Sequence, residues 1–349
     1  MKLIHPPCAE VVKRIISLST NRHALSYGLI LPFSLHERGP SIPSDFSPVW
    51  PWVIASMGED CIFDEAWPKA RGEFLAYGAG YMRDNRAQPL SVRLSVGKHT
   101  KELAVFGDRR FKRLGTYPTP EPFARMPVSP QTAFGGSSFS LNPLGKGAES
   151  QALSDLASSE VSMPNIELPT ELMIAKGDRV TPAGFWSYPP HWPQRTKHLG
   201  SFDDVWQKNR WPHLPLATSS DYYQTAPADQ QLNGFFQGDE TVEIYNMHPQ
   251  FELIATQLPS TRARVFVAGQ TDNSKPSFRE VVVHRETVWL FPDQLSGLLL
   301  FRAVIDLDSE DADDIYCIYA DFEKQTDVPE TLDQHYKNYS ARIGRPSLT

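Results

Sequence analysis

The sequence predicts an α+β protein that is predominantly antiparallel β, with sandwich-like sheets, long ordered Pro/Gly/Trp-rich loops and two C-terminal helices. Three observations predict this class. The last third of the chain alternates short β-branched or aromatic runs with turn residues, which is typical of antiparallel strands. The middle concentrates prolines and tryptophans without long periodic runs, and the C-terminal end changes to helical spacing.

The N-terminal part mixes strands with one helix. Residues 24–31 form an apolar run typical of a strand, and alternating residues in 92–96 and 101–106 flank a Gly-containing turn, which predicts a hairpin. A helix is predicted from apolar residues at helical spacing, namely Phe46, Trp50, Val53, Ile54 and Met57.

The C-terminal third predicts a sheet followed by two helices. Its strands are expected at 240–245, 251–258, 262–268, 279–283, 287–291 and 298–307. The first helix is predicted from Ile315, Ile318, Tyr319 and Phe322 at i, i+3, i+4 and i+7, with Ser309 as its N-cap. The second is predicted from Leu332, Tyr336, Tyr339 and Ile343.

This reading divides the chain into three parts, which are compatible with one continuous domain. They are a mixed N-terminal part (1–115), a loop-rich part (116–239) and a C-terminal sheet with terminal helices (240–349). Aromatic residues in the middle part are expected to anchor its Pro-rich loops onto the core.

Composition and charge predict a soluble cytoplasmic protein. The net charge of -7 argues against general binding to nucleic acid or anionic membranes, and no apolar run is long enough to span a bilayer. The first residues lack the hydrophobic region of a signal peptide, and Cys8, Cys61 and Cys317 are expected to be buried thiols. Residues 305–333 carry eleven acids and one lysine, which predicts either a solvated helix face or a docking surface for a basic partner.

Several enzyme classes find little support in the motifs. Residues 135–139 lack the last glycine of a serine-hydrolase elbow, and residues 78–83 give half of a dinucleotide-binding fingerprint and then end in arginine. His191, His198 and His213, with Asp203 and Asp204 nearby, match no zinc spacing, so no metal and no cofactor is expected. The basic run 109–113 is interpreted as a solvated or salt-bridged surface, with a nucleic-acid patch as the alternative.

One enzymatic or sugar-binding alternative stays open. Acidic and aromatic residues are frequent around 186–240, and paired carboxylates beside aromatic rings suit a hydrolase or a carbohydrate-binding protein. The candidate carboxylates are Asp203, Asp204, Asp229, Asp239 and Glu240.

Four Gly-, Pro- and Trp-rich runs carry a family resemblance. They read Ala133-Phe-Gly-Gly with Asn142-Pro-Leu-Gly, Pro164-Asn-Ile-Glu, Trp192-Pro-Gln-Arg, and Ala226-Pro-Ala-Asp-Gln-Gln followed by Gly238-Asp-Glu. In this order they resemble the bacterial family called domain of unknown function 2169. Two places depart from its pattern: Trp186-Ser187 replace a usual Gly-Pro, and Gly200-Ser201 replace Gly-Thr. We expect these departures to change a loop surface.

The resemblance implies a non-enzymatic adaptor or chaperone beside type VI secretion genes in Gram-negative bacteria. Members of the family are thought to bind a secreted effector and to help load it onto the secretion spike or its PAAR-type tip. The resemblance carries over no catalytic residue. The signature residues are expected to hold a recognition scaffold in shape, and they are Phe134, Gly135, Gly136, Asn142, Pro143, Asn165, Trp192, Arg195, Asp229, Gln230, Asp239 and Glu240.

Overall fold

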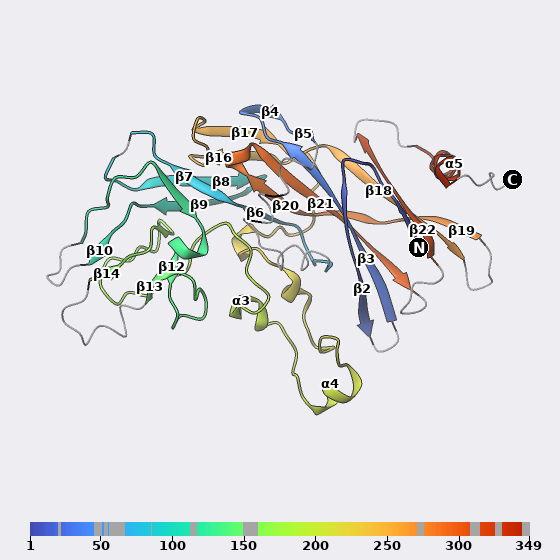
Figure 1. The fold of residues 1–349 in the computed structure, drawn as a ribbon, viewed down its shortest axis with the longest axis horizontal. Helices are drawn as coiled ribbons and strands as arrows, with labels where there is room; N and C mark the ends of the chain where they lie inside the picture. The colour runs from blue at the N-terminus through green and yellow to red at the C-terminus, as the bar shows by residue number, and fades with distance from the viewer. Residues whose placement is uncertain are drawn as a thin grey trace.

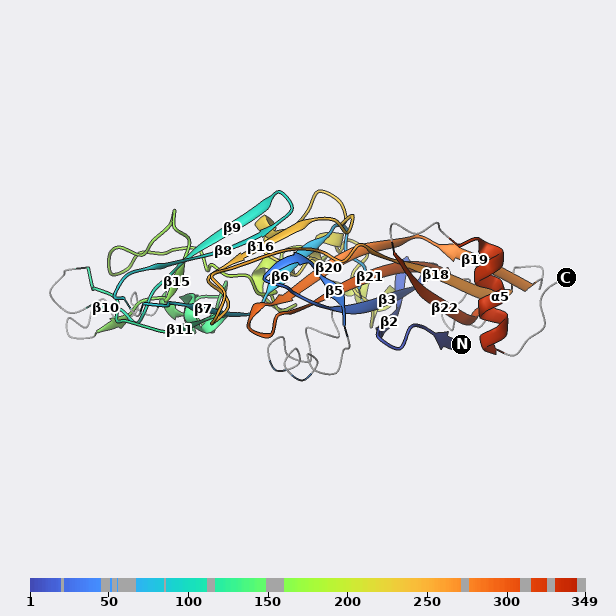
Figure 2. The ribbon, with the colours of Figure 1, turned by 90° about the horizontal axis from the view of Figure 1, so that it is seen from above.

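The protein is a long, flattened body of β-sheets from which one arm projects (Figures 1 and 2). The computed structural model describes residues 1–19, 22–44, 51, 55, 67–84, 86–111, 117–148, 160–270, 276–307, 315–324 and 330–343. Strands β10 and β14 lie at one end of the body and helix α5 at the other, while α4 lies on the arm. The predicted β-rich α+β class, with mostly antiparallel sheets, is confirmed.

The first sheet runs through the centre of the body in the order β2-β3-β21-β20-β6, with β5 also paired to β3. Its strands are β2 (Glu10–Ser19), β3 (Arg22–Ser34), β5 (Ile42–Pro43), β6 (Glu73–Ala76), β20 (Val283–Phe291) and β21 (Ser296–Leu307). β3 and β21 are buried along nearly their whole lengths, as expected for central strands covered on both faces. The strands predicted at 24–31, 287–291 and 298–307 are therefore confirmed.

The second sheet contains the predicted hairpin and has the order β15-β9-β8-β16-β17-β4. Its strands are β4 (Arg38–Pro40), β8 (Leu90–Val96), β9 (His99–Val105), β15 (Ile166–Glu167), β16 (Thr241–Tyr245) and β17 (Leu253–Gln257). β8 and β9 alternate buried and exposed residues, and Gly97 turns between them with a φ of 56°. This positive φ explains why glycine stands at the turn.

The third sheet lies at the C-terminal end in the order β1-β22-β18-β19. Its strands are β1 (Lys2–Ile4), β18 (Thr261–Gln270), β19 (Pro276–Val281) and β22 (Ile315–Lys324). Helix α5 (Leu332–Ile343) packs on it through aromatic rings, with Tyr336 and Tyr339 each about 5 Å from Phe278. The predicted last helix is confirmed.

The other predicted C-terminal helix is wrong, because residues 315–324 form β22. This strand pairs with β18 on one side and β1 on the other, and four consecutive residues, Cys317 to Ala320, are buried. A strand covered on both faces has an apolar run without alternation, so its residues also fit helical spacing. The proposed N-cap, Ser309, lies outside the described residues.

The loop-rich middle part is ordered around short paired segments. These pairs are β7 (Gly78–Tyr81) with β11 (Arg125–Val128), β10 (Arg110–Phe111) with β14 (Val161–Ser162), and β12 (Phe134–Gly135) with β13 (Lys146–Gly147). Its short helices are η1 (Pro130–Thr132), α3 (Pro193–Thr196), α4 (Asp204–Asn209), η3 (Ser220–Tyr223) and η4 (Ala228–Gln230), and η5 (Pro292–Gln294) follows β20. A separate apolar cluster containing Phe111, Phe134 and Met163 lies beneath these loops.

Three further expectations concern the helix near residue 50, the thiols and the membrane. The helix predicted from Phe46, Trp50, Val53, Ile54 and Met57 lies outside the described residues, as does Cys61. Cys317 is buried as expected, whereas Cys8 is only half-buried. Among the described helices, none has the length and apolar character needed to cross a bilayer.

Candidate functional site

The signature residues from Phe134 to Pro143 form a tight double turn closed by a buried amide. Asn142 is fully buried, and its Nδ2 donates to the carbonyl oxygens of Pro130 (2.8 Å) and Phe134 (3.0 Å). Gly136 donates its backbone N–H to the Asn142 carbonyl at 3.0 Å. A Cβ on Gly135 would lie 2.1 Å from that same carbonyl oxygen, so only glycine fits. Pro143 follows half-buried at the end of this turn.

Asn165 has a similar role in the next signature run. Its Nδ2 donates to the Phe106 carbonyl (3.1 Å) and to Asp108 Oδ1 (3.0 Å), and its backbone N–H donates to Thr132 at 2.7 Å. The amide therefore joins three segments that are distant in the sequence. The hydrogen bond to Asn165 lowers the pKa of Asp108, because it stabilises the carboxylate.

Arg109 corrects the expectation that residues 109–113 form a basic surface. Its side chain is buried, with the guanidinium 3.6 Å from the Phe106 ring centre and hydrogen-bonded to the Pro164 carbonyl (2.6 Å) and to Glu167 Oε1 (3.1 Å). Burial raises the pKa of Glu167, and the nearby guanidinium opposes that rise. Arg110 is exposed as expected, and residues 112–113 lie outside the described residues.

The Trp192 run ends in a buried arginine that ties two loops together. Arg195 on α3 donates from Nε to the Tyr222 carbonyl (2.8 Å) and from Nη1 to the Tyr188 carbonyl (3.2 Å). Trp192 is buried beside Tyr188, with ring centres 6.2 Å apart. The first of the two places that depart from the family pattern, Trp186-Ser187, is buried too, and Ser187 Oγ lies 2.8 Å from the Tyr77 hydroxyl. Here the expected change of a loop surface is wrong, because both side chains pack in the core, whereas Ser201 of the second place is exposed in a loop.

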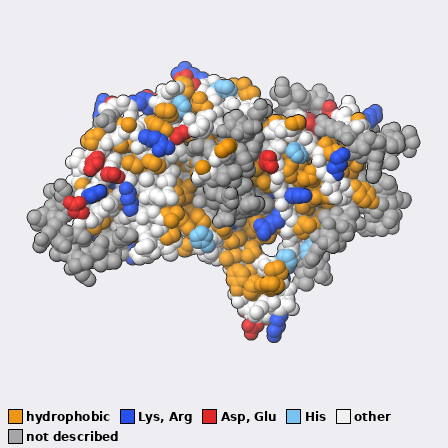
Figure 3. Space-filling model, viewed as in Figure 1, with side chains coloured by type: hydrophobic (Ala, Val, Ile, Leu, Met, Phe, Trp, Pro, Cys, Tyr) orange, Lys and Arg blue, Asp and Glu red, His pale blue; other side chains and the backbone are white. Residues whose placement is uncertain are grey.

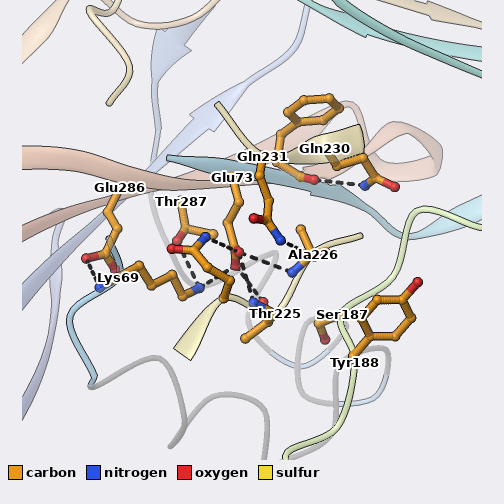
Figure 4. Close-up of polar contacts among 12 residues, drawn as sticks. Lys69, Glu73, Ser187, Tyr188, Thr225, Ala226, Gln230, Gln231, Glu286 and Thr287 are labelled. Carbon is orange, nitrogen blue, oxygen red and sulfur yellow. Dashed lines mark hydrogen bonds and ion pairs between the residues drawn. The ribbon is translucent and has the colours of Figure 1, made fainter. Parts of the chain in front are cut away.

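The last signature run packs against β6 around a buried carboxylate, Glu73 (Figure 4). Glu73 Oε1 accepts from Lys69 Nζ (2.5 Å) and the Thr225 hydroxyl (2.5 Å), while Oε2 accepts from Gln224 Nε2 (2.9 Å) and the backbone N–H groups of Thr225 and Ala226. Both the Glu73 and Lys69 side chains are fully buried. We call Lys69, Glu73, Gln224, Thr225, Glu286 and Thr287 the Glu73 cluster.

Glu286 provides the second buried acid of this cluster. Its Oε2 accepts from the Lys69 backbone N–H at 2.9 Å, and its Oε1 lies 3.4 Å from the guanidinium of Arg302. Lys69 Nζ also donates to the Thr287 hydroxyl at 3.1 Å. Two acids are thus matched by one lysine and one arginine inside the protein, which satisfies the requirement that buried charges be paired.

The pKa values of the two acids of the cluster are shifted in opposite directions. Burial alone would raise the pKa of Glu73, but the Lys69 ammonium and the surrounding hydrogen-bond donors outweigh it, so this pKa lies below its usual value. Burial dominates at Glu286 and raises its pKa, although Arg302 and Lys69 oppose the rise. Because a carboxylate has about four lone-pair positions, the donors on Glu73 saturate it, and it is built to hold loops and not to take a proton from a substrate.

Gln230 and Asp229 extend this region to β9. Gln230 is fully buried and donates from Nε2 to the carbonyls of Phe74 (2.9 Å) and Phe185 (3.2 Å), while its Oε1 accepts from Lys101 Nζ at 3.0 Å. The exposed Asp229 also pairs with Lys101 at 3.0 Å. Burial lowers the pKa of Lys101, and Asp229 opposes this. Gln230 therefore links both large sheets to the loops.

The carboxylates of the hydrolase alternative serve separate local roles. Asp203 caps α4 by accepting from the Trp206 backbone N–H (2.9 Å), and Asp204 lies in the first turn of that helix. Glu240 accepts from the backbone N–H groups of Gln237 (2.6 Å) and Gly238 (2.9 Å), and Asp239 is exposed beside it. Figure 1 places α4 on the arm and β16, which follows Glu240, in the body, so these acids do not converge.

Metal-binding geometry does not occur in the part of the chain that the structure describes. No group of three or more His, Cys, Asp or Glu side chains there is arranged to hold an ion. Of the histidines considered in the sequence, His198 lies at the root of the arm, where its carbonyl accepts from the Ser219 backbone N–H at 2.9 Å. His213 lies on the arm itself, and its carbonyl accepts from Trp206 Nε1 at 2.8 Å.

One signature residue, Arg195, also positions the arm, which we define as residues 199–218. The Ser219 to His198 hydrogen bond closes its root, and Arg195 fixes the chain on either side. Most arm residues are exposed, and its large apolar side chains at the surface are Phe202, Val205, Trp211 and Leu216. Figure 3 shows hydrophobic side chains gathered along this projection.

Sequence reasoning missed the Glu73 cluster, although a signal for it exists. Glu73 opens a short apolar strand, and Arg302 stands within a long apolar one, where a charged residue must either face water or find a partner. Glu286 lies between polar neighbours and gives no such signal. The pairing of these residues depends on the order of β21, β20 and β6 in the first sheet. The periodicity of the sequence does not specify that order.

Comparison with known proteins gives a match to a family model. A family model described as "Uncharacterized protein conserved in bacteria (DUF2169)" matches residues 30–302. The same comparisons find no matching curated protein and no matching solved structure.

Proposed function

Because the chain belongs to the DUF2169 family of bacterial proteins, we propose that it is a non-enzymatic adaptor or chaperone. In this proposal it works in the cytoplasm, binds an effector of a type VI secretion system and helps to load it onto the secretion spike or its PAAR-type tip. The secretion context comes from the family resemblance of the signature runs. The structure supports a narrower part of the proposal, namely that the protein recognises a partner protein.

The observation that carries the proposal is the use of the signature residues. Asn142, Asn165, Arg195 and Gln230 direct their side chains to backbone carbonyls of this same chain and are buried. Such contacts fix loop shape and leave little for a substrate. Arg195 holds the loops from which the arm projects, and the exposed apolar residues of the arm suit a protein partner.

The proposal is tested by co-expressing the full chain with the products of its flanking genes. A tagged protein should co-purify with a toxin-like product at fixed stoichiometry, and deletion of its gene should stop export of that effector while leaving spike assembly intact. Recovery of no flanking product, together with normal effector export from the deletion strain, would refute the proposal.

The hydrolase or sugar-binding alternative has its own test. It would require activity or binding that depends on Asp203, Asp229 or Glu240. Replacing each with its amide should leave effector capture unchanged under the adaptor proposal, because these side chains cap a helix, pair with Lys101 and close a turn.

A further inference from the structure

Strand β2 is the outer strand of the first sheet. It extends from Glu10 to Ser19 and pairs along one side with β3, and no other described strand pairs with it. The outer side of such a strand presents a row of backbone donors and acceptors that another extended chain can pair with. On β2 this row is interrupted at Ser17, whose carbonyl accepts from Arg210 Nη2 at 3.4 Å. Its hydrogen-bonding geometry therefore selects an extended segment.

A groove opens at the end of this edge, where the arm returns to the body. It encloses about 250 Å³ and is lined by Ile16 and Leu18 of β2, by Leu216 of the arm, and by Trp67 and Tyr223. The Trp67 and Tyr223 rings stack on each other with centres 4.8 Å apart and together form an aromatic side of the groove. It therefore suits a large apolar side chain.

Exposed apolar side chains lie on both β2 and the arm, and two of them, Leu18 and Leu216, line the groove. Ile15 and Leu18 on β2 are 44% and 43% exposed, and Trp211 and Leu216 on the arm are 69% and 57% exposed. Arg210 joins the two parts, because its Nη1 donates to Ser17 Oγ at 2.8 Å. Clustered apolar residues that include a tryptophan are typical of the centre of a protein interface.

The charge along this edge indicates the charge of the partner that it can bind. Lys13 and Arg14 are exposed on β2 against a single acid, Glu10, and the Arg14 guanidinium lies 4.7 Å from the Trp67 ring centre. Arg210 adds another positive charge at the groove, and none of its lining residues is acidic. This edge is therefore basic in a chain whose net charge is -7, and it complements an acidic partner.

We propose that the outer edge of β2 and the adjoining groove form the docking site for an extended, acidic segment of the effector. The segment adds to the first sheet as a further strand, sets acidic residues against Lys13 and Arg14, and places a large apolar side chain against Trp67. The identity of the partner rests on the proposed function. A second copy of this chain fits less well, because two β2 edges would oppose like charges.

Two probes test this site with the full-length protein. One is the co-expressed effector from the flanking gene. The other is a synthetic peptide that alternates valine with aspartate and ends in phenylalanine, compared with the same peptide carrying lysine for aspartate. We expect the acidic peptide to bind about tenfold more tightly or better at low salt, with the difference shrinking as salt rises. Hydrogen exchange should slow at β2 amides when either the effector or the acidic peptide binds.

Matched variants locate the contact. Lys13→Glu and Ile15→Asp should each weaken binding of effector and acidic peptide by about tenfold or more, and Lys13→Glu should favour the lysine peptide. The controls are Lys98→Glu in the β8–β9 turn and Ile42→Asp on β5, which change exposed residues elsewhere. Circular dichroism and thermal unfolding check that each variant is folded.

The outcomes separate the site from the proposed function. Effector binding that both β2 variants retain at full strength would overturn the site and leave the adaptor function standing. Capture of no effector, with the acidic peptide still preferred and sensitive to Lys13→Glu, would support the site and refute the function. If neither the effector nor the acidic peptide binds, both the docking site and the adaptor function are overturned. If the free protein forms a dimer that Ile15→Asp dissociates, the edge belongs to the contact with a second copy.

Discussion

The Glu73 cluster and the arm differ in how their side chains meet water. Around Glu73, charged and amide groups are buried, and each has a partner within the chain. On the arm, apolar groups such as Trp211 are exposed, and the exposed Asp203 caps the arm's own helix, α4. A charge inside and an aromatic ring outside are both costly placements, which points to different tasks for the two regions.

Arg195 connects these tasks physically. It lies in a signature run and is buried, yet its two backbone acceptors, Tyr188 and Tyr222, lie on the segments from which the arm departs. The interior therefore determines where the arm stands, and the arm provides the apolar contact surface. The comparison predicts that mutations in the interior change stability, whereas mutations on the arm change binding.

Removing the central carboxylate should have the largest effect. Glu73→Ala leaves the Lys69 ammonium buried without its carboxylate partner, and removing one member of a buried pair costs about 3–5 kcal/mol. Urea unfolding followed by circular dichroism measures the loss. The control is Asp306→Ala, whose exposed pair with Arg22 at 3.9 Å should contribute less than about 1 kcal/mol. Equal losses in the two variants would contradict the central role of Glu73.

Replacing Arg195 should lower the stability of the fold by an intermediate amount and should increase local opening of the arm. Arg195→Met keeps much of the side-chain volume but leaves the Tyr188 and Tyr222 carbonyls without this donor, at a cost of about 2 kcal/mol. Hydrogen exchange should accelerate in residues 199–218 more than in β3 or β21. The exposed Arg86, which pairs with Asp84 at 2.6 Å, provides the control variant Arg86→Met. Unchanged exchange in the arm would break the proposed link between interior and arm.

The sequence predicted well those features that depend on local pattern. The β8–β9 hairpin follows from alternation and a turn glycine, and α5 follows from the spacing of Tyr336 and Tyr339. The prediction failed at β22, where burial on both faces removes the alternation that identifies a strand. Local spacing cannot tell such a central strand from one face of a helix.

The site was less predictable than the fold, for a physical reason. The runs that contain Asn165 and Gln230 were identified as signatures, but their acceptors, including the Phe106, Phe74 and Phe185 carbonyls, come from distant segments. Arg109 was read as part of a basic surface because its neighbours are basic, whereas the fold buries it against Glu167. Which charges pair inside a protein depends on strand order, and strand order is a property of the whole chain.

Lowering the pH should destabilise the interior and the packing of α5 before it affects the arm. Burial opposes ionisation of Glu323, but hydrogen bonds from Arg262, Arg264 and His335 outweigh it and lower the pKa to about 2, and the pKa of Glu73 is lowered as well. A lowered folded-state pKa gives stability that is complete above the unfolded value of 4.5 and is lost as pH falls toward 2. Unfolding midpoints from pH 6 to 2 should show this decline. Glu323→Gln should flatten it, and an unchanged slope would contradict this assignment.

Replacing Trp211 should have the smallest effect on stability. Among arm residues, it should have the largest effect on effector binding. Its side chain is 69% exposed, so Trp211→Ala should change the unfolding free energy by less than about 0.5 kcal/mol. Exposed tryptophans beside a groove are typical binding hot spots, so effector affinity should fall by about 2 kcal/mol or more. Unfolding curves and titration of the co-purified effector measure the two quantities separately. The buried Trp192 provides the opposite case, because Trp192→Ala should cost about 3–5 kcal/mol of stability. If Trp211→Ala destabilises the fold as much as Trp192→Ala does, the arm belongs to the interior and the division between the two regions fails.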